Sequence, residues 1–157
     1  MNAPDYSSLD AADRRILAIL VTEGRIPVTE LATRVGLSKT PCQTRMKRLQ
    51  QQGFILGFKA VLDPMRLGRA HVAFVEVRLS DTREPALRGF NEAAREVAEI
   101  EQVHMIAGAF DYLLKVRSAD IVEYRRVLGE VISRLPHVAA TSTHVSMEAV
   151  KDEVGTL

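Results

Sequence analysis

The first 60 residues carry apolar side chains with the period of an α-helix. One stripe consists of Ala12, Ile16, Ile19 and Leu20. Asp10 stands just before this stripe, where a carboxylate can cap the helix. A shorter helix is predicted between Pro27 and Gly36, and a third between Ser38 and Gly53, because serine caps helices and glycine commonly ends them. The pattern therefore predicts three helices, with a tight glycine turn between the second and the third.

Two short stretches, 54–56 and 59–62, flank Gly57 and suit the strands of a β-hairpin wing. With the three helices, this predicts a winged helix-turn-helix domain over residues 1–62. Residues 63–70 contain proline and glycine, and we expect a linker there between two domains.

The pattern changes at residue 71, where apolar and polar side chains begin to alternate as in a strand. The expected elements are a strand over 71–79, a helix over 84–97, a strand over 100–106, a turn over 108–111, a strand over 112–116, a helix over 120–134 and a strand over 138–147. This β-α-β-β-α-β order is typical of the ferredoxin-like fold. We therefore expect an α+β protein whose second domain covers residues 71–157.

Charge is distributed unevenly between the two predicted domains. Residues 1–60 carry nine Lys/Arg against five Asp/Glu, whereas residues 61–157 carry twelve against fifteen, although the whole chain has a net charge of only +1. Within 38–59 there are five basic residues and no acidic one. A basic patch on a nearly neutral protein indicates a polyanionic partner for that patch alone.

The third predicted helix has the side chains of a DNA recognition helix. Its outward side has short polar residues near the start and cations further along, which suits base reading by Gln43 and Thr44 and phosphate binding by the cations. The candidate DNA-binding residues are Ser38, Lys39, Thr40, Gln43, Thr44, Arg45, Lys47 and Arg48. An ordinary solvated helix face is the alternative, but the preceding short helix, the glycine turn and the missing acids favour double-stranded DNA as the partner.

Other chemistry has little support in the sequence. Cys42 lies on the core side of its helix, so we interpret it as a small buried side chain rather than a redox switch. The four histidines show no metal-ligand spacing, and no catalytic or phosphate-binding motif is present, so we expect no metal, no cofactor and no enzyme activity. The start of the chain has no signal-peptide pattern and no apolar run approaches the ~20 residues of a membrane span, so we expect a cytoplasmic location.

The segment 104–112 could bind an amino acid. A glycine-containing turn can present backbone amides to a carboxylate, and Asp111 could bind the ammonium group. The alternative is a structural hairpin in which Asp111 accepts hydrogen bonds from the turn. On the residues alone the structural reading is favoured.

Beyond these patterns, the chain resembles the Lrp/AsnC family of bacterial regulators over nearly its whole length. In the first half the similar runs are Leu9-Asp10, Asp13-Arg14-Arg15-Ile16-Leu17, Leu31-Ala32-Thr33-Arg34-Val35-Gly36-Leu37-Ser38 and Arg45-Met46-Lys47-Arg48-Leu49. In the second half they are Phe74-Val75-Glu76-Val77 and Gly108-Ala109-Phe110-Asp111-Tyr112-Leu113-Leu114-Lys115. Within the family the resemblance is closest to the leucine-responsive type, which includes regulators of proline and other amino-acid catabolism.

The resemblance implies a transcriptional regulator of amino-acid metabolism that dimerises through its ferredoxin-like domains and assembles further into tetramers or octamers. It also implies that a small-molecule effector, an amino acid, binds at the oligomer interface and favours a functional role for Asp111. The response region then falls on Met105, Gly108, Asp111, Ile121, His144, Val145 and Ser146. Leucine-responsive members tend to carry tyrosine in place of His144 and valine in place of Ser146, which argues against leucine as the effector.

Two other classes of function are considered. Some haem-pathway decarboxylases resemble the same architecture, but the basic third helix, free of acids, argues against an enzyme. A stand-alone amino-acid sensor without DNA contact would leave the first 60 residues unexplained.

Overall fold

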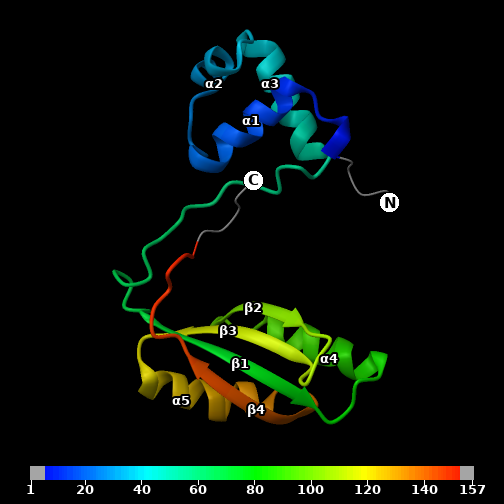
Figure 1. Cartoon of the computed structure of the whole chain (residues 1–157), viewed down its shortest axis with the longest axis vertical. Coiled ribbons are helices and arrows are strands. Elements are labelled where there is room, and N and C mark those ends of the chain that lie inside the picture. The colour runs from blue at the N-terminus through cyan, green and yellow to red at the C-terminus, as the bar shows by residue number, and fades with distance from the viewer. Residues whose placement is uncertain (1–5, 153–157) are drawn as a thin grey trace. The chain divides into compact units, whose positions relative to one another are not determined.

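The computed structural model describes residues 6–152 and divides them into two compact units (Figure 1). The described residues up to Val61 belong to the first unit, and Leu62–Val150 form the second. Each unit has its own hydrophobic core, so we describe each by itself.

The first unit consists of a short 3-10 helix, Tyr6–Ser8, and three α-helices: α1 (Ala11–Thr22), α2 (Val28–Val35) and α3 (Lys39–Gln51). Asp10 caps α1 as predicted, because its side chain accepts a hydrogen bond from the Asp13 amide at 2.9 Å. Gly36 ends α2 in the left-handed region, with φ 74°, where glycine avoids the strain of a side chain. The predicted helix-turn-helix is therefore confirmed.

The core of this unit comes from all three helices, as their apolar stripes predict. Its buried members are Leu9, Ile16, Leu17, Leu20, Leu31, Ala32, Val35, Cys42 and Leu49. Burial also raises the pKa of the Cys42 thiol, which keeps it protonated and unreactive. The thiol therefore packs as a small apolar group and not as a redox switch.

The two wing strands predicted from 54–56 and 59–62 are wrong: the structure has no strand between Gln51 and His71. Side chains here are largely exposed, with Leu56 at 96% and Val61 at 93%. Phe54 and Ile55 pack against the core of the first unit, but residues 56–62 are exposed, and an isolated hairpin of two such short strands is only marginally stable.

The second unit is a four-stranded antiparallel sheet with two helices. Its elements are β1 (His71–Leu79), α4 (Glu84–Arg95), β2 (Ile100–Met105), β3 (Tyr112–Ser118), α5 (Ile121–Glu130), a 3-10 helix (Ile132–Arg134) and β4 (Val138–Val145). The strand order is β2-β3-β1-β4, with β3 and β4 both paired to the central β1. This confirms the β-α-β-β-α-β order predicted from the sequence.

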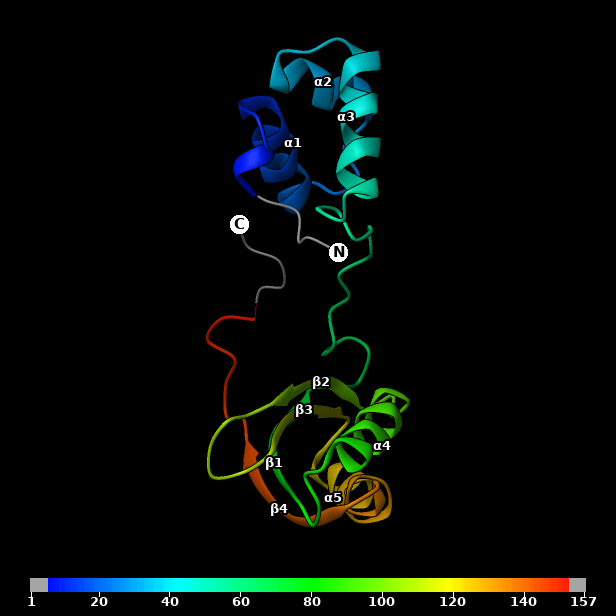
Figure 2. The same cartoon turned by 90° about the vertical axis from the view of Figure 1, so that its right-hand side faces the viewer.

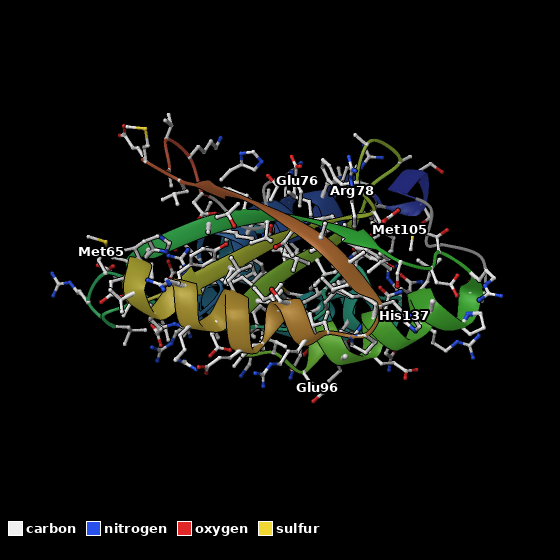
Figure 3. All side chains as sticks on the ribbon, turned by 90° about the horizontal axis from the view of Figure 1, so that it is seen from below. Met65, Glu76, Arg78, Glu96, Met105 and His137 are labelled. Atoms are coloured by element: carbon white, nitrogen blue, oxygen red, sulfur yellow. The ribbon has the colours of Figure 1, made fainter. Side chains whose placement is uncertain are left out.

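The alternation along β1 decides which face of the sheet is buried. Ala73, Val75 and Val77 face the helices and are fully buried, together with Leu114 and Val116 of β3. Helices α4 and α5 cover this face (Figure 2). Figure 3 shows Glu76 and Arg78 on the opposite face, and no helix of residues 62–150 covers them.

Element ends differ from the predictions by a few residues. Helix α4 ends at Arg95, two residues early, and β4 ends at Val145 rather than at residue 147. The last predicted helix divides after Glu130 into a short 3-10 turn, which places Ile132 in the core. Strand β3 continues to Ser118, because its pairing with His71 extends the ladder.

Candidate functional site

The outward side of α3 is accessible, as DNA binding requires. Thr40, Gln43, Thr44 and Lys47 are exposed, whereas Cys42 and Leu49 face the core. Ser38 and Lys39 at the start of the helix are exposed too, although the Ser38 side chain makes no capping hydrogen bond. The fold thus places the predicted base-reading side chains together on one accessible surface.

Two of the predicted phosphate-binding residues have partners within the unit. Arg45 donates from Nη1 to Asp13 Oδ1 at 2.9 Å and to Asp10 Oδ2 at 2.5 Å. Arg48 donates from Nη2 to the other oxygen of Asp13. The Asp13 amide and Arg45 lower the pKa of Asp10 from 3.8 to about 2, so this carboxylate is charged at neutral pH.

Lys39 and Lys47 differ from the two arginines. Within residues 6–152 neither ammonium group has an ion-pair partner. Both side chains are exposed, so both remain accessible to an anion.

The predicted effector residues fall into two groups in the second unit. Met105, Gly108 and Asp111 form the first group, in the hairpin that joins β2 to β3. The hairpin is bound to the end of β1: the Asp111 amide donates to the Val77 carbonyl at 2.9 Å, and Asp111 Oδ2 accepts from the Leu79 amide at 2.7 Å. One oxygen of Asp111 therefore has a structural role in holding this hairpin.

The second group lies at the opposite end of the sheet. His144 pairs with Phe74 and Val145 with Ala73, and the Ser146 amide donates to the Val72 carbonyl at 2.9 Å. Ile121 follows β3 at the same end, because Ser118 pairs with His71. Ile121 and Val145 are about half exposed, at 54% and 48%.

The two groups do not meet within one chain. Val72 and Val77 mark their positions along β1, and five strand residues span about 17 Å. Figure 3 shows Met105 at one end of the sheet and Met65, from the segment before β1, at the other. This separation exceeds the length of a free amino acid, so one copy of the chain cannot surround such a ligand with both groups.

Residue His144 also has a partner on the open face of the sheet. Its Nε2 lies 3.1 Å from Glu76 Oε1 on the neighbouring strand β1. Arg78, further along the same face, donates from Nε to the Ala109 carbonyl at 3.0 Å.

Several of these partners were missed by the sequence analysis. Asp13 was not among the predicted site residues, yet it is 1% exposed and accepts from both arginines. A single aspartate among the buried positions of an apolar stripe is the signal that points to such a partner. Glu76 gives a similar signal, because it is an acidic residue within a strand of mostly apolar side chains.

Metal and membrane binding have no support in the described part of the chain. Within residues 6–152 no group of His, Cys, Asp and Glu side chains could hold a metal ion. The same residues include no helix with the length and apolar character that crossing a bilayer requires.

Comparison with known proteins matches both units. Residues 9–55 match a model described as winged helix-turn-helix DNA-binding, and residues 72–156 match the Lrp/AsnC ligand binding domain. A proline dehydrogenase transcriptional activator from Rhizobium radiobacter is 60% identical over 96% of this chain and 97% of its own length. The leucine-responsive regulatory protein of Escherichia coli K12 is 47% identical over 91% of this chain and 87% of its own length.

Solved structures agree with this fold. An AsnC family transcriptional regulator from Agrobacterium tumefaciens superimposes with a TM-score of 0.89 at 31% identity, covering 95% of this chain and 97% of that one. A transcriptional regulator from Neisseria meningitidis, solved as a complex with L-Met, also gives a TM-score of 0.89 at 25% identity, covering 96% and 97%.

The relatives are regulators of transcription, which confirms the expectation that the chain is not an enzyme and removes the decarboxylase alternative. An exposed recognition helix, the sheet domain and the matches to both units lead to one conclusion: the chain belongs to the Lrp/AsnC family of DNA-binding transcriptional regulators.

Proposed function

We propose that this regulator controls genes of amino-acid metabolism and that its effector is an amino acid bound between copies of the chain. The proposal is supported by the position of the predicted effector residues at the two ends of one sheet, about 17 Å apart along β1. Two copies can bring the hairpin of one chain beside the far end of another, which a single copy cannot do.

The DNA-binding half of the proposal rests on α3. Its exposed polar side fits the major groove, where Gln43 and Thr44 read base edges and Lys47 contacts phosphate. Thr44 donates its hydroxyl proton to the Thr40 carbonyl at 3.1 Å, so it meets a base edge as an acceptor. Gln43 has both an amide donor and a carbonyl acceptor, which is the pair that reads adenine.

The effector half rests on the chemistry of the hairpin. Asp111 Oδ2 is occupied by the Leu79 amide, whereas Oδ1 accepts no hydrogen bond within the described residues and can bind an ammonium group. At the other end, His144 and Ser146 are polar, which argues against a leucine side chain there. The name of the Rhizobium radiobacter relative refers to proline dehydrogenase and the Neisseria meningitidis relative was solved with L-Met, so proline and methionine are the first ligands to test.

Self-association is proposed through the second unit. The sheet face that bears Phe74 and Leu113, both half-buried, has no helix of residues 62–150 over it. We infer a dimer that uses this face and assembles into tetramers or octamers. A regulator that binds the bacterial chromosome acts in the cytoplasm, and we place this protein there.

Regulation then follows from differential binding. An amino acid that binds one assembly more tightly than another shifts the population toward it, and a coupling of about 1–3 kcal/mol is enough to change DNA occupancy several-fold. The shift changes the spacing of the recognition helices and leaves the helices themselves intact.

The proposal is tested by a thermal-shift screen of the full chain against the twenty amino acids. One or a few should raise the melting temperature, because a ligand at 100 times its Kd adds about 2.7 kcal/mol of stability. The same amino acids should change the sedimentation profile and the affinity for DNA. Absence of any stabilising amino acid, or stabilisation that is the same in a variant held monomeric, would refute binding between copies.

A further inference from the structure

The ion pairs between α1 and α3 join two segments that are distant in sequence. We call Asp10, Asp13, Arg45 and Arg48 the clamp. Asp13 binds one arginine with each carboxylate oxygen, Arg45 at 2.9 Å and Arg48 at the other oxygen. Asp10 binds Arg45 as well, at 2.5 Å.

Burial makes the clamp more than a surface ion pair. Asp13 is 1% exposed, and a buried carboxylate is costly unless it is paired and hydrogen-bonded. It accepts from the Asp10 amide at 3.3 Å in addition to the two guanidinium groups. Arg45 and Arg48 are therefore required by Asp13, and their charges are balanced by Asp13 and Asp10.

The geometry fixes how α3 is turned about its own axis. Arg45 and Arg48 are three positions apart, so they lie on one side of the helix and bind the same carboxylate. Two bonds nearly one turn apart oppose both rotation and sliding of α3 against α1. The directions of Gln43 and Thr44 depend on that rotation.

The charges of the clamp also cancel. Two aspartates and two arginines sum to zero, which leaves Lys39 and Lys47 as the cations of α3 without an ion-pair partner in residues 6–152. The charge that α3 offers to a phosphate backbone is therefore about half of what its sequence suggests.

We propose that Asp13 is a positioning residue for the recognition helix, with Arg45 and Arg48 as its structural partners, and that Lys39 and Lys47 make the phosphate contacts of α3. The inference rests on the proposed DNA binding through α3. It changes the roles that the sequence analysis gave to the two arginines.

The test compares two adjacent cations. Full-chain Arg48→Gln and Lys47→Gln are measured on a duplex that the wild-type protein enriches from a random pool and on a random duplex, at several salt concentrations. Lys47→Gln should weaken binding to both duplexes and reduce the salt slope by about 0.9, as the loss of one phosphate contact does. Arg48→Gln should leave the salt slope and the random duplex unchanged and reduce discrimination by about 5- to 150-fold, comparable to one mismatched base pair.

Substitution of Asp13 should change the affinity for the random duplex in the opposite direction from Lys47→Gln. Asp13→Asn releases Arg48 and leaves Arg45 with Asp10 as its one charged partner, so binding to the random duplex should tighten and the salt slope should steepen, while discrimination falls. Loss of binding to both duplexes by a folded Asp13→Asn protein would overturn the inference. If this variant does not fold, Arg48→Gln decides, together with Asp10→Ser, which keeps a capping side chain and removes only the Asp10–Arg45 bond.

The outcomes separate this inference from the proposed function. A salt slope that falls equally in Arg48→Gln and Lys47→Gln would overturn the clamp and leave DNA binding through α3 in place. A wild-type protein that enriches no sequence from the pool would overturn both.

Discussion

Substitution of Asp111 can separate the structural role of its carboxylate from the role that the proposed function gives it. Oδ2 accepts from the Leu79 amide at 2.7 Å, and the proposed function gives Oδ1 to the ammonium group of the effector. Alanine removes both interactions. Asparagine keeps an oxygen that can accept from Leu79 but removes the negative charge.

The expected magnitudes differ for stability and for binding. In Asp111→Ala the Leu79 amide, which is partly buried, loses its acceptor, which should destabilise the second unit by about 1–3 kcal/mol. In Asp111→Asn the unfolding free energy should change little. A hydrogen bond to a charged group contributes about 1.5–3 kcal/mol, so both variants should lose roughly 10- to 150-fold in effector affinity.

Urea denaturation of the two variants measures the unfolding free energy. Calorimetric titration with the amino acid found in the thermal-shift screen measures the effector affinity. DNA affinity without effector should match the wild type in Asp111→Asn. An Asn variant that binds the amino acid as tightly as the wild type would refute the ammonium contact. An Ala variant as stable as the wild type would refute the structural role of the hairpin bond.

Three further predictions concern the remaining parts of the chain. Gly36→Ala should destabilise the first unit by about 1–2 kcal/mol, since φ is 74° and a new Cβ meets nothing within 4 Å, so the cost is conformational. Gly89→Ala, in the interior of α4, should instead stabilise the second unit by about 0.5–1 kcal/mol; urea denaturation checks both signs, and two losses of equal size would contradict the argument. Gln43→Ala should relax sequence preference, whereas Lys47→Ala should weaken binding to all duplexes alike. Competition between the enriched duplex and random DNA tests this. If both variants lost the same affinity for the enriched and the random duplex, the prediction would be refuted. The depressed pKa of Asp10, about 2 against 3.8, stabilises the folded first unit above pH 4 and this stability is lost as the pH falls to about 2. Asp10→Asn should remove that part of the pH dependence in acid unfolding curves, and an unchanged curve would show that other groups produce it.

Most of the fold could be predicted because its determinants are local. The stripe that contains Ile16 and Leu20, the cap at Asp10 and the stop at Gly36 each act within one or two turns of helix. The alternation through Val75 likewise marks a strand with one buried face. Periods of 3.6 and 2 are visible in the order of residues alone.

The two wing strands were predicted wrongly and the clamp was not predicted, because both depend on contacts that are not local in the sequence. Phe54 and Ile55 pack against the core of the first unit, and residues 54–56 do not pair with 59–62, which the alternation of short apolar stretches does not reveal. The partners of Arg45 and Arg48 lie 32 and 35 residues earlier in the chain, so a helical projection of α3 displays both side chains as solvated cations. Only the packing of α1 against α3 reveals that they are neutralised.

The resemblance to a family predicted which residues respond to an effector, but not where they lie on the sheet. It selected Met105, Asp111 and His144 together, with no sign that they lie at different ends of the sheet. The directions of β3 and β4 decide that separation, because residues just before β3 and residues at the end of β4 meet opposite ends of β1. The topology therefore gives a physical reason for the binding between copies that the resemblance implied.

The clamp and the proposed effector site, divided between two ends of the sheet, together restrict how regulation can work. Helix α3 is held to α1 by a buried core and by two arginines on one carboxylate, so an effector in the other unit has no soft element within the helix-turn-helix to move. A ligand that needs both ends of the sheet must draw them from different copies, so its binding energy acts on the arrangement of copies. Under the proposed function, signal transfer therefore consists of moving intact DNA-binding units relative to one another, and coupling of about 1–3 kcal/mol is enough for it because no internal packing has to be broken.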